Sequence, residues 1–318
     1  MKKLTIHHDF NLGLKFYTIP EFFRNKVMSD FENLNFKDIK DEIRLDRVEI
    51  FFGNRIKTEN IKQMINLKWI HLGSVGYDSI DLHLINERKI LLTNSKGLMT
   101  NSIVEHALNY ITTFSRGMHY LNKLRHSNDL NRRSFDYYFH KVSNLKNKNI
   151  LICGFGEVGS KLANVLSCLG MNIFTISKTP KNIFNNYRLK DLTKILPEMS
   201  YVVNLLPLNN ETFKLFDLNK FKLMNDSYFI NLGRGKTVIE KDLIKAIKMG
   251  YINSAALDVF EEEPLSNKSD LLKQEKIIIT PHVAGLSVNY WNEQLELFNY
   301  NLRKFQKNEK TMKNLILQ

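Results

Sequence analysis

The feature that most constrains this chain is a glycine-rich turn placed between a buried strand and a helix. An unbroken apolar run occupies residues 150–152. It leads into the sequence GFGEVG, whose glycines are Gly154, Gly156 and Gly159. We expect the helix to begin at Ser160. In this context G-x-G-x-x-G is typical of dinucleotide binding, because the turn brings a pyrophosphate to the free N–H groups of a helix N-terminus. A turn that only allows tight packing is the alternative.

Length and composition indicate a globular protein with room for two domains. The chain has 318 residues, of which 43% are hydrophobic. Cys153 and Cys168 both look like small core residues, and two cysteines do not indicate a disulfide framework, which fits a reducing compartment. The N-terminus lacks the apolar core of a signal peptide, and no apolar stretch is long enough to span a bilayer. We expect a cytoplasmic protein that does not bind membranes.

The chain carries a formal net charge of +13, from 46 Lys and Arg against 33 Asp and Glu. A basic chain can bind nucleic acid. Here the basic residues are scattered and form no block, so we expect no nucleic-acid partner. A basic field would still attract anionic substrates and cofactors.

Apolar strands alternate with helical segments along most of the sequence. We expect strands at 4–6, 48–52, 69–72, 90–93, 150–153, 172–176, 201–206, 228–231, 255–259 and 277–280. Helices are expected at 58–66, 81–88, 101–116, 160–169, 241–249 and 291–304, with helical spacing also within 20–45. Thr58 is a plausible N-cap, as is Asn101 or Ser102, and residues 122–148 read as a surface excursion. The alternation predicts an α/β fold with a doubly wound parallel sheet, whose ligands bind outside the carboxyl ends of the strands.

Polar side chains follow several of these predicted strand ends. His282 could donate a proton, because imidazole titrates near neutral pH; a solvated histidine is the alternative. Arg234 lies between two glycines, and its guanidinium could grip a carboxylate through two hydrogen bonds and polarise the neighbouring carbonyl. A surface arginine in a turn is the alternative there.

Four segments, taken in order, resemble the D-isomer-specific 2-hydroxyacid dehydrogenases. They are the glycine motif, NLGRG at 231–235, DVFEEEP at 258–264 and TPHVAG at 280–285. Upstream, residues 73–82 resemble the carboxylate-binding turn of the family, and residues 94–108 resemble its hinge segment and the following helix. The resemblance implies a Rossmann dinucleotide-binding domain at 100–287. It also implies a smaller, discontinuous flavodoxin-like substrate domain at 1–99 and 288–318, with the substrate in the cleft between the two.

The resemblance implies hydride transfer between NAD(P)H and a small 2-keto or D-2-hydroxy acid. His282 would donate the proton, and Arg234 would hold the carboxylate. Glu263, the glutamate directly before proline, would hold His282 and favour its protonated form; Glu261 and Glu262 could be solvated residues only. The other side of the carboxylate would meet the turn Ser74, Val75 and Gly76.

The cofactor contacts implied by the resemblance come from the glycine motif and from the segments after later strands. They are Gly154, Phe155, Gly156, Glu157, Val158, Gly159, Ser177, Lys178, Leu206, Pro207, Thr212, Leu232, Gly233, Asp258, His282 and Gly285. In the family, Asp258 matches an acidic residue near the nicotinamide carboxamide. No metal is expected.

Two positions depart from the family pattern. NAD-preferring members carry an Asp after the second strand, where it binds the adenosine ribose. This chain has Ser177 there, followed by Lys178. Nothing acidic would repel a 2′-phosphate, so we hypothesise a preference for NADPH, although NADP-preferring relatives usually show an Arg. Lys96 stands where relatives often carry Pro, which could loosen the hinge or add a cation near the cleft.

Ser177 and Lys178 favour a glyoxylate or hydroxypyruvate reductase. A D-lactate or 3-phosphoglycerate type is the alternative, although the chain leaves no room for the regulatory domain of long phosphoglycerate enzymes. A non-catalytic nucleotide-sensing relative is a third reading, against which the intact catalytic residues weigh. Relatives are commonly homodimers that pair through the nucleotide domain, and we expect the same. The pocket for the substrate side chain has candidates without clear chemistry in Phe10–Phe16, Phe52–Arg55 and Met99.

Overall fold

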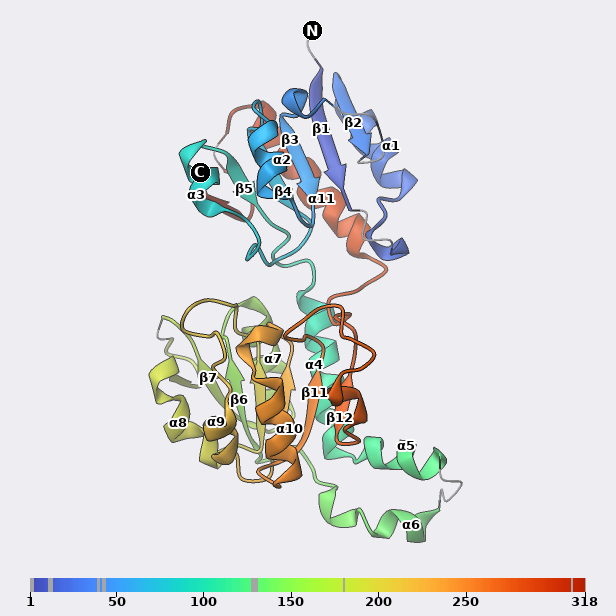
Figure 1. The fold of residues 1–318 in the computed structure, drawn as a ribbon, viewed down its shortest axis with the longest axis vertical. Coiled ribbons are helices and arrows are strands. Elements are labelled where there is room, and N and C mark those ends of the chain that lie inside the picture. Colours follow the sequence, from blue (N-terminus) through green and yellow to red (C-terminus); the bar gives the residue numbers. More distant parts are fainter. Residues whose placement is uncertain are drawn as a thin grey trace. The chain divides into compact units, whose positions relative to one another are not determined.

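The computed structural model describes residues 3–10, 14–38, 41, 44–126, 131–179, 181–309 and 311–317. Residues 11–13, within one segment considered for the substrate pocket, lie outside the described residues. The chain forms two compact units (Figure 1). Met1–Met99 and Leu286–Gln318 form one, called here the discontinuous unit, and Thr100–Gly285 form the other, called the central unit.

The central unit contains a seven-stranded sheet in which every described pair is parallel. Its strand order is β12-β11-β10-β9-β6-β7-β8. The order changes direction at β6, so this is the doubly wound Rossmann arrangement, with a crevice at the carboxyl ends of β6 and β9. The strands are β6 (Asn149–Cys153), β7 (Asn172–Ile176), β8 (Asn185–Tyr187), β9 (Tyr201–Asn204), β10 (Ser227–Asn231), β11 (Ile252–Leu257) and β12 (Ile277–Ile279).

Two apolar cores cover the faces of this sheet. Successive residues of β6 enter different cores, since Ile150 and Ile152 join one while Leu151 and Cys153 join the other. The first core is closed by α4 (Thr100–Ser115) and α7 (Glu157–Cys168). The second is closed by α8 (Leu192–Ile195), α9 (Leu218–Lys222) and α10 (Glu240–Lys248). Beyond α4 the chain forms α5 (Met118–His126) and α6 (Arg132–Asp136).

The discontinuous unit contains a six-stranded sheet in the order β13-β5-β4-β3-β1-β2. The five parallel strands follow the flavodoxin order 2-1-3-4-5, as predicted, and β13 adds an antiparallel edge. The strands are β1 (Leu4–Asp9), β2 (Leu34–Asp38), β3 (Ile50–Gly53), β4 (Trp69–Leu72), β5 (Leu91–Thr93) and β13 (Leu315–Leu317). One face packs on α1 (Glu21–Asp30) and α11 (Tyr290–Gln306), and the other on α2 (Thr58–Gln63) and α3 (Leu82–Glu87) (Figure 1).

Short 3₁₀ turns complete the described secondary structure. They are η1 (Lys15–Tyr17), η2 (Leu45–Arg47), η3 (Phe139–Lys141), η4 (Leu189–Asp191), η5 (Leu196–Glu198), η6 (Gly235–Thr237) and η7 (Asp270–Lys273).

Several local predictions were wrong. The strands β2, β8 and β13 were not predicted: all three are short, and β2 and β8 carry polar residues at many positions. Residues 122–148 were expected to form a surface excursion, and their described part contains the end of α5, all of α6 and η3. Thr58 is the first residue of α2, not its cap, and α4 begins before Asn101 and Ser102. Cys168 is exposed, because it lies on the solvent side of α7.

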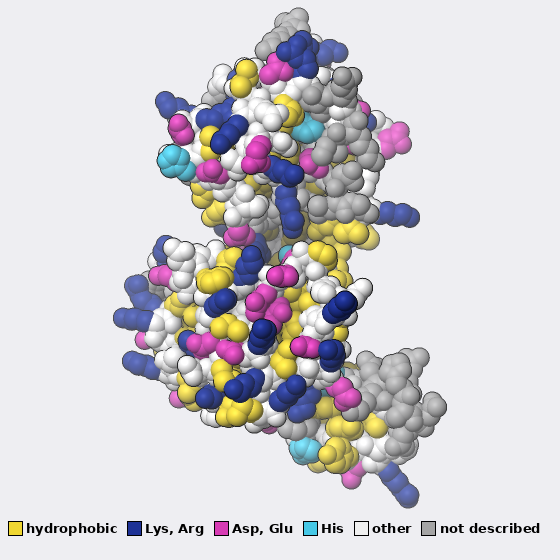
Figure 2. Space-filling model, viewed as in Figure 1, with side chains coloured by type: hydrophobic (Ala, Val, Ile, Leu, Met, Phe, Trp, Pro, Cys, Tyr) yellow, Lys and Arg dark blue, Asp and Glu magenta, His cyan; other side chains and the backbone are white. Residues whose placement is uncertain are grey.

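The surface agrees with a scattered basic composition. Figure 2 shows Lys and Arg interspersed with Asp and Glu on the visible faces of both units. Within the described part of the chain, no helix has the length and apolarity needed to cross a membrane.

Candidate active site

The glycine motif forms a turn that only glycine can make. Gly154 has φ 106°, which is the left-handed region that L side chains rarely adopt. A Cβ on Gly159 would lie 2.1 Å from the Gly154 carbonyl oxygen, whereas a Cβ on Gly156 would meet no atom within 4 Å. Helix α7 begins at Glu157, inside the motif, and not at Ser160 as predicted. Its N-cap, Gly156, has no side chain to bond the first N–H groups, which leaves them to a ligand.

The loops after β9 and β10 are tied together by two buried asparagines. Asn204 Nδ2 donates to Asn231 Oδ1 at 3.0 Å. Asn204 Oδ1 accepts the N–H of Leu206, and Asn231 Oδ1 accepts the N–H of Gly233. Asn204 was not predicted, and Asn231 was named only as part of the NLGRG motif, although each is a polar residue that ends an apolar strand. Their bonds fix the loops that carry Leu206, Pro207, Leu232 and Gly233.

Thr212 also supports a loop. Its hydroxyl donates to the Pro207 carbonyl at 2.6 Å, and the Asn209 N–H donates to it at 2.9 Å. Thr212 is 3% exposed. The hydroxyl is therefore already bonded within its own loop and shapes the segment after Pro207.

The end of β7 carries a hydroxyl and two lysines. Ser177 Oγ lies 2.6 Å from the Thr179 carbonyl oxygen and 3.0 Å from Asn186 Oδ1. Lys178 is exposed. Lys181, which the sequence analysis missed, donates from Nζ to the Phe155 carbonyl at 3.0 Å and lies 5.0 Å from the Phe155 ring centroid. A second cation therefore lies directly on the glycine turn.

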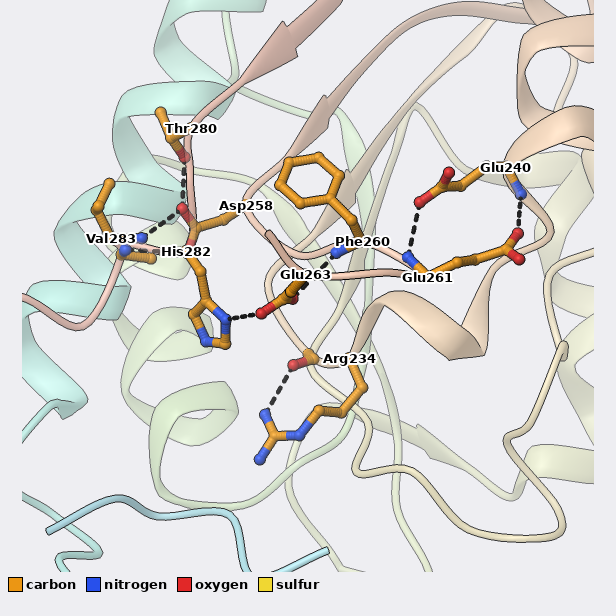
Figure 3. Close-up of polar contacts among 11 residues, drawn as sticks. Arg234, Glu240, Asp258, Phe260, Glu261, Glu263, Thr280, His282 and Val283 are labelled. Atoms are coloured by element: carbon orange, nitrogen blue, oxygen red, sulfur yellow. Dashed lines mark hydrogen bonds and ion pairs between the residues drawn. The ribbon is translucent and has the colours of Figure 1, made fainter. Parts of the chain in front are cut away.

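Asp258 holds the segment that carries His282. It is 2% exposed, and its carboxylate accepts the N–H groups of Val283 and Ala284 at 2.8 and 2.9 Å. The Thr280 hydroxyl donates to the same carboxylate at 2.5 Å (Figure 3). Three bonds to a buried carboxylate fix the backbone on both sides of His282. This positioning role is not evident from the sequence, because the bonded groups lie 22 to 26 residues away.

Two side chains of helix α4 contact Thr280 in the same segment. The Tyr110 hydroxyl and His106 Nε2 lie 2.5 and 3.1 Å from Thr280 Oγ1. Burial raises the pKa of Tyr110 to about 12 and lowers the pKa of His106. Both side chains are therefore held in their neutral forms at pH 7.

His282 and Glu263 form a close pair. His282 Nδ1 lies 2.6 Å from Glu263 Oε2, and Figure 3 shows the imidazole pointing at the carboxylate. The other ring nitrogen, Nε2, remains on the open side of a ring that is 51% exposed. Burial alone would raise the pKa of Glu263. The hydrogen bond and charge of His282, the Phe260 N–H and the charge of Arg234 outweigh burial and hold this pKa below its usual value of 4.5.

Arg234 is half-buried at the carboxyl end of β10. Its Nη1 donates to the Gly233 carbonyl at 2.9 Å, and its own carbonyl accepts the Thr237 hydroxyl at 2.6 Å. The next residue must be glycine, because a Cβ on Gly235 would lie 1.8 Å from the Phe260 carbonyl oxygen. The loop of Arg234 is thus packed against the loop that ends at Glu263.

The three neighbouring glutamates have different environments. Glu261 Oε1 accepts the N–H of Glu240, and Glu240 Oε1 accepts the N–H of Glu261, both at 2.7 Å (Figure 3). Glu261 therefore anchors the start of α10 and is not only solvated, while Glu262 is exposed. Among the described residues, no group of three His, Cys, Asp or Glu side chains could hold a metal ion.

The turn Ser74–Gly76 belongs to the discontinuous unit and follows β4. Ser74 Oγ donates to the Gly76 carbonyl at 2.9 Å. Within the described part of the chain, the backbone N–H groups of Val75 and Gly76 have no acceptor, and the Val75 side chain is 38% exposed. The turn therefore offers two adjacent donors. Lys96 is exposed and lines an 870 Å³ pocket of this unit together with residues of α11.

The chain is similar to known oxidoreductases. Residues 108–284 match the family model described as "D-isomer specific 2-hydroxyacid dehydrogenase, NAD binding domain". The glyoxylate reductase of Pyrococcus furiosus is 29% identical over 300 residues, which are 92% of this chain and 88% of that protein. The glyoxylate reductase of Pyrococcus horikoshii is 30% identical over 285 residues, 86% of this chain and 85% of that one.

Solved structures share the fold of both units. A probable 2-hydroxyacid dehydrogenase from Rhizobium etli, in complex with NADP, HEPES and L(+)-tartaric acid, has a TM-score of 0.80 and 23% identity. The match covers 99% of this chain and 98% of that one. The similarity therefore extends over the discontinuous unit as well as the central unit.

Proposed function

This chain belongs to the D-isomer-specific 2-hydroxyacid dehydrogenases, which are NAD(P)-dependent oxidoreductases, and we propose that it reduces small 2-keto acids such as glyoxylate and hydroxypyruvate. The observation that carries the proposal is the contact between His282 and Glu263, 2.6 Å long, beside Arg234. A proton donor with a carboxylate partner and a neighbouring guanidinium is what reduction of a 2-keto acid requires.

The bound nicotinamide cofactor supplies the hydride. Gly154 to Gly159 and the start of α7 fit its pyrophosphate, because the turn leaves backbone N–H groups without a side-chain cap. His282 Nε2 would give a proton to the substrate oxygen, while Glu263 holds the ring through Nδ1. Arg234 would bind the carboxylate and polarise the carbonyl. In the discontinuous unit, the N–H groups of Val75 and Gly76 would bind the same carboxylate.

We further propose a preference for NADPH. Ser177 replaces the acid that would repel a 2′-phosphate, the exposed Lys178 follows it in the sequence, and Lys181 places a positive charge on the glycine turn. Ser177→Asp is expected to shift the ratio of kcat/KM values for NADPH and NADH towards NADH, and Lys178→Ala is expected to weaken NADPH alone. Lys194→Ala, at an exposed lysine on α8, is the matched control. An unchanged ratio in Ser177→Asp would contradict the preference.

Pairing into a homodimer through the central unit is also proposed. The support is a pair of exposed aromatic side chains: Tyr137, directly after α6, is 77% exposed, and Phe139, the first residue of η3, is 72% exposed. Light scattering after size exclusion tests this, with Tyr137→Ser and Phe139→Ser expected to favour monomers. A monomeric wild type would contradict it.

The direct test of function is oxidation of NADPH and NADH by the purified protein with glyoxylate, hydroxypyruvate, pyruvate, phenylpyruvate and 3-phosphohydroxypyruvate. Fast turnover on the first two supports the proposal. Preference for pyruvate or for the phosphorylated acid would reassign it to the D-lactate or phosphoglycerate type. Cofactor binding without turnover on any acid would indicate a nucleotide-sensing role.

A further inference from the structure

A chain of polar side chains lies buried behind the turn Ser74–Gly76. Its members come from β4, from β5 and the residues that follow it, and from α11 at the far end of the sequence. Each has 0% of its surface exposed: Trp69, His71, Thr93, Ser95 and Gln294. Buried polar groups destabilise a fold unless they are hydrogen-bonded, so the bonds among these five decide whether the cluster is tolerated.

The members lie within hydrogen-bonding distance in series. Trp69 Nε1 donates to Thr93 Oγ1 at 2.9 Å, and Thr93 Oγ1 lies 2.7 Å from His71 Nδ1. The Gln294 amide group lies 2.7 Å from His71 Nε2 and also 2.7 Å from Ser95 Oγ. Ser95 Oγ lies 2.7 Å from the carbonyl oxygen of Leu72, which ends β4 two residues before the turn.

The number of available hydrogens decides in which direction the hydrogen bonds of this series run. Burial lowers the pKa of His71 to about 3, so its ring is neutral and carries one N–H. If the Gln294 nitrogen faced His71, the Ser95 hydroxyl would have one proton for two acceptors. The Thr93 hydroxyl would then receive two donors and have no acceptor among the described residues.

With the Gln294 amide turned by 180°, each contact in the series has one donor and one acceptor. Trp69 donates to Thr93, Thr93 to His71 Nδ1, and His71 Nε2 to Gln294 Oε1. The series then continues to its end, since Gln294 Nε2 donates to Ser95 and Ser95 donates to the Leu72 carbonyl. The Ser95 hydroxyl is thereby held on the Leu72 carbonyl at the end of β4, while the Ser95 N–H bonds the turn itself.

The same elements hold each carbonyl of the turn in succession. The Gly73 carbonyl accepts the Tyr290 hydroxyl of α11 at 2.6 Å. The Ser74 carbonyl accepts the Ser95 N–H at 3.1 Å, and the Val75 carbonyl accepts Asn94 Nδ2 at 2.6 Å. In a trans peptide the N–H of the next residue points opposite to the carbonyl. Holding these carbonyls therefore aims the N–H groups of Val75 and Gly76 away from the protein, as donors for a ligand.

We propose that Gln294 is a positioning residue that acts through Ser95 to fix the direction of the two N–H donors of the Ser74–Gly76 turn. This inference rests on the proposed function, in which those donors bind the substrate carboxylate. Gln294 would touch neither substrate nor cofactor. Its effect would appear in substrate binding and not in cofactor binding.

The test compares Gln294→Met, which keeps the volume and removes the amide, with Asn299→Leu on the same helix. Asn299 is 5% exposed, and its Nδ2 donates to the Asp30 carboxylate at 3.0 Å. Gln294→Met is expected to raise KM for glyoxylate about three- to tenfold, the effect of one lost hydrogen bond, with the Kd for NADPH unchanged. Asn299→Leu is expected to lower Tm with KM unchanged. An unchanged KM in Gln294→Met, or an equal rise in both variants, would overturn the inference.

Val75→Pro, which deletes one of the two N–H donors, separates this inference from the proposed function. If Val75→Pro keeps the wild-type KM, the turn does not bind the carboxylate and both proposals fail. If Val75→Pro raises KM while Gln294→Met does not, only the positioning role fails.

The wild-type protein provides a readout that needs no substitution. Long-range ¹H–¹⁵N spectra should show His71 protonated at Nε2 and not at Nδ1. The opposite tautomer would reverse the series, leave Ser95 without a donor from Gln294, and overturn the inference.

Discussion

The two units offer their candidate substrate contacts in different forms. In the central unit the contacts are side chains at the surface, and His282 and Glu263 are 51% and 28% exposed. In the discontinuous unit they are backbone N–H groups, supported by side chains that are fully buried. Chemistry carried by a side chain is removed by one substitution. A backbone donor survives most substitutions at its own position and is altered mainly through the residues that hold it.

Removing the proton donor is expected to have the largest effect. His282→Asn should lower kcat for glyoxylate about 10²- to 10⁴-fold, the usual contribution of general acid catalysis. The Kd for NADPH should stay near the wild-type value, because Asp258 holds the surrounding backbone without the imidazole. Steady-state rates and cofactor titration measure the two effects. A kcat within threefold of wild type would contradict the assignment.

The next largest effect is expected at Arg234. Arg234→Lys keeps the charge and loses the geometry that donates two parallel hydrogen bonds to a carboxylate. The transition state should lose about 1.5–3 kcal/mol of stabilisation, so kcat/KM should fall roughly ten- to a hundredfold. Lys236→Ala, at an exposed lysine of the same loop, is the control and should leave kcat/KM unchanged. Equal losses in the two variants would remove the special role of Arg234.

The side-chain site also depends on its backbone, which Gly235→Ala would reveal. The added Cβ would lie 1.8 Å from the Phe260 carbonyl oxygen and would push apart the loops of Arg234 and Glu263. We expect a stability loss of about 1–3 kcal/mol together with a lower kcat. Gly250→Ala is the comparison, since Gly250 has φ 75° but no atom within 4 Å of the added carbon. It should lower Tm and leave kcat unchanged. Denaturant titration and rate measurements distinguish the two.

The smallest expected effect concerns pH. The pKa of Glu263 in the folded state lies below 4.5, so its ionised form stabilises the fold above that pH, and this contribution is lost as pH falls through the folded pKa. The Tm difference between wild type and Glu263→Gln should therefore shrink as the pH falls below 4.5. A difference that grows on acidification would contradict the sign of this shift.

The sequence predicted the part of the site that side chains carry. Arg234, Glu263 and His282 could be identified because their types suit the chemistry and because each lies near a predicted strand end. The sheets and most helices were predicted from apolar alternation, and the family from four ordered motifs. The start of α7 was placed three residues late, because helical geometry begins within a motif that reads as a turn.

The sequence could not reveal the residues that position others. Gln294 lies 199 positions from Ser95, and only the packing of α11 on the sheet brings them together. Asp258 accepts hydrogen bonds from the backbone N–H groups of Val283 and Ala284. Nearly every residue type has such an N–H group, so the sequence does not indicate these bonds. β8 is held by pairing with β7 and has the polar sequence NNY, so local pattern did not predict it.

The contrast between the two units is tested most directly by the binding of oxamate, a 2-keto acid analogue that is not reduced, to the NADPH complex of three proteins. Titration calorimetry would compare the wild type, His282→Asn and Val75→Pro. We expect Val75→Pro to lose affinity for oxamate and His282→Asn to bind it within a few-fold of wild type. Full affinity in Val75→Pro, with the loss found instead in His282→Asn, would contradict the assignment of carboxylate binding to the backbone turn and of proton donation to His282.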